Sequence, residues 1–111
     1  MTEQQITRLR NRIKKGHNSQ IKSTGDRIMF LKEGLSHFEE EEKYELCNLF
    51  LECIQELQQI EKADTKSGSK FEDLLFNVSF KYTILANEYI AVIVDQAIDQ
   101  INERDILNDF D

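Results

Sequence analysis

The side chains able to act as nucleophiles or as acid–base groups near neutral pH are few and lie apart in the sequence. The chain of 111 residues has two histidines, His17 and His37, and two cysteines, Cys47 and Cys53. Nucleophilic catalysis needs a base next to the nucleophile, but His17 lies in a polar junction beside a glycine and His37 follows a helix-start pattern. We expect both histidines at the surface and predict no catalytic residue.

The two cysteines indicate neither a metal site nor a disulfide. They lie six residues apart within one predicted helix, about 9 Å along its axis, which is too far for an intrachain disulfide. No cysteine–histidine cluster has the spacing of a zinc site, and no glycine-rich phosphate loop is present. We expect small apolar side chains in a reducing cytoplasm, with no bound metal or cofactor.

Two acidic segments form the one pattern typical of an enzyme. Segments 41–45 (EEKYE) and 61–64 (EKAD) resemble the EExxE…ExxD signature of all-α nucleotide pyrophosphohydrolases of the MazG type. This resemblance of nine residues implies carboxylates that bind magnesium and the phosphates of a nucleotide, after the second motif folds back onto the first. Here residues 46–60 are predicted to be unbroken helix, which separates Glu45 from Glu61 by about 24 Å. One cation, with ligands near 2 Å, cannot join them.

The composition favours long helices. The sequence has no proline, four glycines and 32% charged residues, and proline is the strongest helix breaker. No apolar run approaches the ~20 residues that span a bilayer, and the first residues lack the apolar stretch of a signal peptide. We expect a cytoplasmic protein without a membrane partner.

Three capping-box patterns mark predicted helix starts, because a hydroxyl residue followed three positions later by Glu or Gln satisfies two backbone amides. They lie at residues 2–5, 36–39 and 69–72. The last two begin helices over about 37–64 and 70–104, joined by a loop at 65–68. A loop this short makes its two helices antiparallel neighbours.

Each of these two helices carries a heptad seam, in which apolar residues alternate at steps of four and three. The seam of the first is Leu46, Phe50, Cys53, Leu57 and Ile60. The seam of the second is Phe71, Leu75, Val78, Tyr82, Leu85, Tyr89 and Val92. The chain is therefore predicted to be all-α, an antiparallel helical bundle built on a long helical hairpin with one or two shorter N-terminal helices.

The N-terminal segment permits two arrangements. Its apolar residues fit two helices over about 3–15 and 19–34, with glycines at the ends, and they also fit one helix that continues through Gly16. We expect a single domain with three segments. These are a basic helical segment at 1–35, an acidic hairpin at 36–107 and a frayed tail at 108–111.

Charge is unevenly distributed. Residues 1–32 hold eight basic and two acidic residues, a net of +6, whereas residues 33–111 hold six basic and nineteen acidic residues, a net of −13. The basic segment could bind nucleic acid through residues 8–32, or it could pack against the acidic body within the chain or across a dimer. The residues expected to contact nucleic acid are Arg8, Arg10, Arg12, Lys14 and Lys15.

Apolar residues outside the seams predict a protein interface, because a lone hairpin would leave them in water. The expected interface residues are Cys47, Leu51, Ile54, Phe80, Ile84, Ala91 and Ile98. We therefore predict a homodimer that acts without catalysis as a protein-binding regulator or adaptor with an acidic body. Nucleic-acid binding is the alternative, and a magnesium-dependent pyrophosphohydrolase is the remote one.

Overall fold

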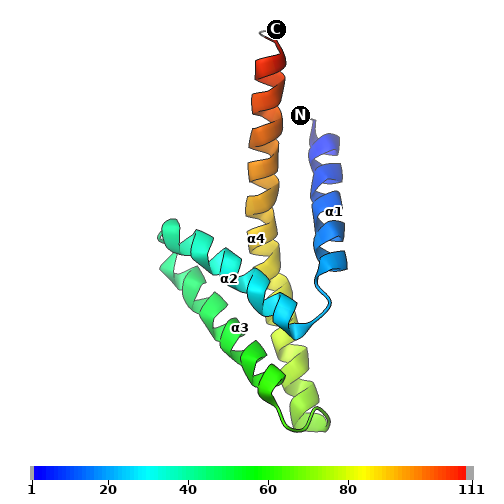
Figure 1. Cartoon of the computed structure of the whole chain (residues 1–111), viewed down its shortest axis with the longest axis vertical. Helices are drawn as coiled ribbons and strands as arrows, with labels where there is room; N and C mark the ends of the chain where they lie inside the picture. The colour runs from blue at the N-terminus through cyan, green and yellow to red at the C-terminus, as the bar shows by residue number, and fades with distance from the viewer. Residues whose placement is uncertain (1, 110–111) are drawn as a thin grey trace.

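Four helices account for nearly all of the described chain. The computed structural model describes residues 2–109, with side chains described from residue 2 to residue 102. Its elements are α1 (Glu3–Gln20), α2 (Thr24–Glu40), α3 (Tyr44–Lys62) and α4 (Ser69–Asp109). The predicted all-α helical bundle is confirmed, and α3 and α4 form its antiparallel hairpin (Figure 1).

The helix expected over 37–64 is wrong at its start. Residues 37–40 belong to α2, and Ser36 lies inside that helix instead of capping the next one. α2 ends because Glu42 has a positive φ of 59°. Its amide donates to the Glu39 carbonyl while the Lys43 amide donates to the Phe38 carbonyl. This is a Schellman motif, whose left-handed residue is usually glycine, so Glu42 gave no sequence signal.

The N-terminal segment forms two helices, which settles the alternative left open by the sequence. α1 continues through Gly16 to Gln20, beyond the expected end near 15. α2 starts at Thr24 because the Ser23 hydroxyl accepts from the Asp26 amide at 3.1 Å. The Lys22 amide donates to the Asp26 carboxylate at 3.0 Å. These two hydrogen bonds fix the corner between α1 and α2.

The other two capping boxes have different outcomes. Thr2 caps α1 as predicted, since its hydroxyl accepts from the Gln5 amide and the Gln5 side chain accepts from the Thr2 amide. Ser69 is already the first residue of α4, where the Gly68 carbonyl accepts from the Glu72 amide. Ser69 therefore does not occupy the N-cap position that the box at 69–72 predicts.

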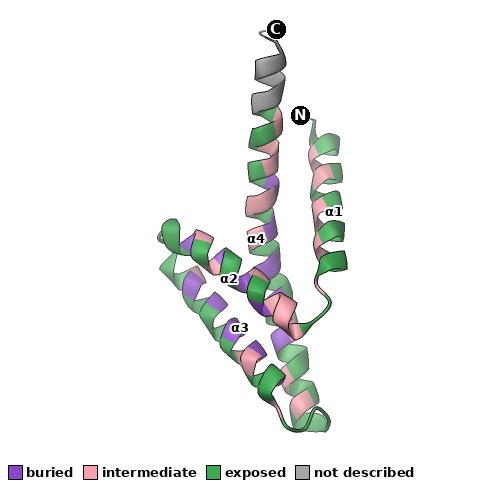
Figure 2. Cartoon of the chain, in the orientation of Figure 1, coloured by how far each residue is buried: buried purple, intermediate pink, exposed green. Residues whose placement is uncertain are grey.

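The core lies where α2, α3 and α4 meet. Its fully or almost fully buried side chains include Leu31, Phe50, Cys53, Leu57 and Val78. Figure 2 shows the buried residues gathered on the inward faces of these three helices. α1 has no buried residue and packs along the second half of α4.

α4 is much longer than its neighbours. Its 41 residues correspond to about 60 Å, and it passes residue 104, where the sequence placed its end. Residues 108 and 109 of the expected frayed tail are helical, and residues 110 and 111 lie outside the described residues. Among the described residues, no helix has a segment apolar enough over a sufficient length to cross a membrane.

Gly34 sets the distance between α2 and the two helices it covers. A Cβ at this position would lie 2.7 Å from a ring carbon of Phe50 and 3.1 Å from Cγ of Tyr89. Phe50 is completely buried, so its ring has no space into which it can move. Gly34 is therefore an interior packing residue, and the prediction that it ends the helix is wrong.

We expect Gly34→Ala to destabilise the protein by about 1–3 kcal/mol, because the added methyl group overpacks the core. Gly16→Ala is the matched control, since a Cβ there meets nothing within 4 Å. It should stabilise the protein by about 0.5–1 kcal/mol through helix propensity alone. Urea unfolding followed by circular dichroism measures both, and equal effects of the two substitutions would contradict this account of α2 packing.

Candidate functional site

The predicted interface residues divide into two groups. Phe80 and Ile84 are 64% and 49% exposed, Leu51 and Ala91 are also exposed, and Ile98 is half-buried. Cys47 and Ile54 are each only 5% exposed and belong to the core. These two are a correction to the expected interface, because the longer α2 covers the side of α3 on which they lie.

An exposed apolar surface runs along the first half of α4. Phe76, Phe80 and Ile84 recur every four residues and so share one side of the helix. Phe76 is 74% exposed, and Leu49 of α3 is 52% exposed. We call these four residues the outer apolar face. Leu49 and Phe76 are not among the interface residues predicted from the sequence, although Phe76 precedes Phe80 by one helical turn.

Leu49 and Ile84 meet across a shallow groove between α3 and α4. The groove has a volume of about 180 Å³ and is also lined by Glu52, Lys81 and Leu85. Lys81 donates to Glu56 at 2.8 Å, and this hydrogen bond raises the pKa of Lys81 above its usual value. The apolar floor therefore has charged side chains at its edge, an arrangement common in protein-binding surfaces.

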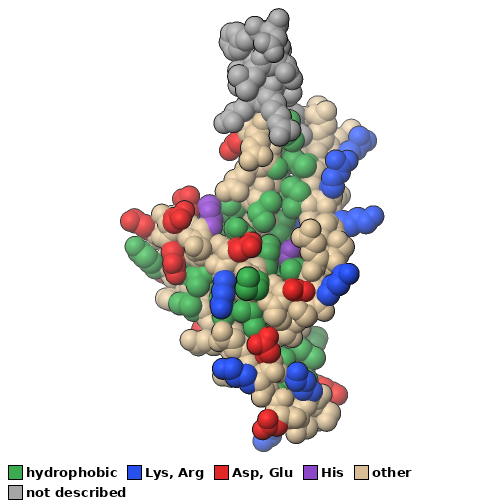
Figure 3. All heavy atoms as spheres, viewed as in Figure 1, with side chains coloured by type: hydrophobic (Ala, Val, Ile, Leu, Met, Phe, Trp, Pro, Cys, Tyr) green, Lys and Arg blue, Asp and Glu red, His purple; other side chains and the backbone are tan. Residues whose placement is uncertain are grey.

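The basic residues of α1 point into solvent. Arg8, Arg10, Arg12 and Lys15 are exposed and Lys14 is half-buried. Figure 3 shows Lys and Arg side chains spaced along the edge of the molecule that α1 forms. Within residues 2–102, the one ion pair joins Lys81 to Glu56. The described part of the acidic body therefore does not neutralise α1 through ion pairs.

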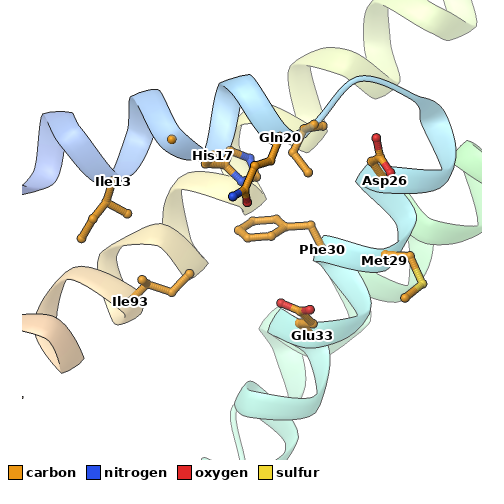
Figure 4. Close-up of a pocket in the computed structure, with 10 residues that line it drawn as sticks. Ile13, His17, Gln20, Asp26, Met29, Phe30, Glu33 and Ile93 are labelled. Atoms are coloured by element: carbon orange, nitrogen blue, oxygen red, sulfur yellow. The ribbon is translucent and has the colours of Figure 1, made fainter.

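A pocket of about 500 Å³ lies between α1, α2 and α4. Its apolar walls include Ile13, Phe30 and Ile93, and Asp26 and Glu33 lie on its α2 side (Figure 4). Figure 3 shows apolar side chains continuing from this region along α4.

His17 connects the three helices around this pocket. Its ring centroid is 4.1 Å from that of Phe30 on α2, and its Nε2 is 3.2 Å from the Tyr82 hydroxyl on α4. Arg27 lies over the Tyr82 ring, with its guanidinium carbon 5.1 Å from the centroid. The histidine expected at the surface is thus half-buried in a helix junction.

The chemistry available around His17 is that of a structural contact. Partial burial lowers the pKa of His17, which favours the neutral ring. Burial also raises the pKa of Tyr82 to about 12, so its hydroxyl keeps its proton.

Cys53 is completely buried, and burial raises the pKa of its thiol to about 11. A protonated, inaccessible thiol is unreactive.

The acidic segments lie as expected from an unbroken helix. Glu45 and Glu61 are in the first and last turns of α3, about 24 Å apart along the axis. Among the described residues, no group of three or more His, Cys, Asp or Glu side chains is placed to hold a metal ion. The geometry that the pyrophosphohydrolase signature requires is not present in α3.

In comparisons with known proteins, no family model, no curated protein and no solved structure matches this chain.

The pKa of His17 predicts a pH dependence of stability. Because the folded pKa is below the unfolded value of about 6.5, the unfolded chain binds the proton more tightly. Stability should therefore fall as the pH is lowered from 7.5 to 5.5. His17→Gln should reduce this pH-dependent change in melting temperature relative to the wild type. Equal changes in wild type and His17→Gln would show that His17 does not couple to folding.

Proposed function

We propose that this protein is a non-enzymatic protein-binding regulator or adaptor that associates with itself. The observation that carries the proposal is the outer apolar face. Phe76 and Phe80 are 74% and 64% exposed, which leaves roughly 250 Å² of aromatic surface in water, given the size of a phenylalanine side chain. With Leu49 and Ile84, the surface reaches the few hundred Å² typical of interaction sites on monomers.

The acidic body supports a role in recruiting other proteins. The chain has a net charge of −7, and residues 33–111 alone carry −13. A surface of one sign steers a partner of opposite sign and raises the association rate more than the affinity. The two free, buried cysteines support a reducing, cytoplasmic compartment as the setting.

Sedimentation equilibrium tests the self-association. We expect a mass of two chains at tens of micromolar, and a monomer mass for the variant in which Phe76 and Phe80 are both replaced by Ser. Met29→Ser is the control, because Met29 is 62% exposed but lies on α2, and it should remain dimeric. A monomeric wild type across this range would refute self-association.

Co-purification then tests the binding of other proteins. A lysate of the source cells is passed over the wild type and over the same Phe76 and Phe80 variant. The regulator hypothesis expects a stoichiometric partner that the wild type retains and the variant loses, while Met29→Ser retains it. If wild type and variant retain the same proteins, the outer apolar face is not the binding surface.

Nucleic-acid binding is the second candidate function, favoured by the exposed basic residues of α1. A helix with basic residues on its outer side can follow a phosphate backbone, and its affinity then falls steeply with salt. The charge of residues 33–111 opposes such binding over the rest of the surface. We therefore rank nucleic-acid binding below protein binding.

Mobility shift with labelled duplex DNA and RNA at low salt measures this activity. If α1 binds nucleic acid, replacing Arg8, Arg10 and Arg12 by Ala should weaken binding by about tenfold or more, since each phosphate contact contributes. The control replaces Lys62, Lys66 and Lys70 by Ala, which removes the same charge at the other end of the molecule. Equal losses in the two variants would indicate non-specific attraction only, and no shift at tens of micromolar would eliminate this candidate.

A further inference from the structure

We propose that two copies of this chain pair through antiparallel α4 helices, in a register that places Lys81 beside Glu88 of the partner subunit. This inference rests on the proposed self-association and names its surface and geometry. Its basis is a second seam on α4, separate from the seam that faces α2 and α3.

The second seam has the spacing of a coiled coil. Its residues alternate at steps of four and three, as packing between two helices requires. They are Phe80, Ile84, Asn87, Ala91, Val94, Ile98 and Ile101. Val78, Tyr82 and Leu85 of the first seam are buried inside the chain. α4 therefore carries two helix-packing surfaces, and the fold of one copy leaves the first half of the second surface open.

The second seam is open along its first half. Phe80, Ile84, Asn87 and Ala91 are all exposed. Further along, Val94 is 1% exposed and Ile98 is half-buried, in the part of α4 against which α1 packs. The surface free to take a second helix therefore extends from Phe76 to about Ala91, on the side of α4 that α1, α2 and α3 leave uncovered.

Side-chain size favours one antiparallel register. When Phe80 faces the partner's Ala91, a large ring lies against a methyl group at both ends of the contact, which allows close packing. Ile84 then faces the partner's Asn87 near the twofold axis. The symmetry makes each of these contacts occur twice, as in any isologous dimer.

Charge favours the same register. Lys81 and Glu88 follow seam positions Phe80 and Asn87 directly, so they flank the seam on one side. In the proposed register, each Lys81 lies beside the partner's Glu88. A shift of one heptad in either direction would bring Lys81 against the partner's Lys81, or Glu88 against the partner's Glu88. In a parallel pairing, Thr83 and Ile90 would face the partner's acidic residues, and no opposite charges would meet.

Lys81 can make this contact while it keeps its intrachain partner. The Lys81 side chain is 49% exposed although it is bound to Glu56, and an ammonium group has three donors. Stable dimers bury about 800 Å² on each partner. The outer apolar face supplies a few hundred Å² of this, and the side chains that flank the open part of the second seam add to it.

Charge reversal tests the pairing by sedimentation equilibrium of the full chain. K81E alone and E88K alone should each raise the dimer dissociation constant, by about tenfold, since two pairs are lost in each variant. The double variant K81E/E88K should restore the wild-type value. A double variant as weak as K81E would overturn the register, even if the wild type is a dimer and the proposed function stands. A monomeric wild type would overturn both proposals.

Cysteine cross-linking provides a readout that does not depend on affinity. Phe80→Cys and Ala91→Cys combined in one chain should form disulfide-linked dimers on mild oxidation, because position 80 of each copy faces position 91 of the other copy. These positions are eleven residues apart in one helix, about 16 Å, so no intrachain bond can form. Each single variant should stay uncross-linked. Equal cross-linking of a single variant and the double variant would contradict the antiparallel register.

Discussion

The close contact of α2 with both α3 and α4 is the packing constraint on which the rest of the structure depends. Because Gly34 has no side chain, the rings of Phe50 and Tyr89 lie so close to the α2 backbone that they occupy the space of a Cβ methyl group. This approach brings Leu31 and Phe38 of α2 into the core, where both are almost fully buried. Without α2, the α3–α4 hairpin would join along a single seam, and the second apolar side of α3 would remain in water.

The sequence predicted the helices and most of the core because the spacing of apolar residues along a helix shows which side is buried. The heptad pattern of α3 predicts four residues that are all buried: Phe50, Cys53, Leu57 and Ile60. The turn after α2 was not predictable in the same way. Its left-handed residue is Glu42, a residue type that does not signal a helix end. The glycine expected to end the helix, Gly34, is instead a packing residue.

This misplacement of one helix boundary also explains which of the predicted interface residues are exposed and which are buried. An α2 that ended near residue 34 would leave Cys47 and Ile54 exposed to water, and for this reason the sequence predicts them as interface residues. The observed α2 reaches Glu40 and covers them. Phe80 and Ile84 lie off the first seam of α4 and remain 64% and 49% exposed, as their positions on the helix predict. The sequence does not predict the pocket around His17, because the pocket requires α4, which is distant in sequence, to pack against the corner between α1 and α2.

In the proposed dimer, the two packing surfaces of α4 separate folding from association. Val78, Tyr82 and Leu85 of the first seam are buried within the chain, so folding of one copy already covers the centre of that seam. The second seam adds no buried contact along Phe80, Ile84 and Ala91 within the chain. Substitutions there remove little from the stability of the monomer, since exposed positions contribute little to folding. If the proposed pairing holds, its affinity can therefore change by orders of magnitude while the monomer stays folded, as the proposed regulatory role requires.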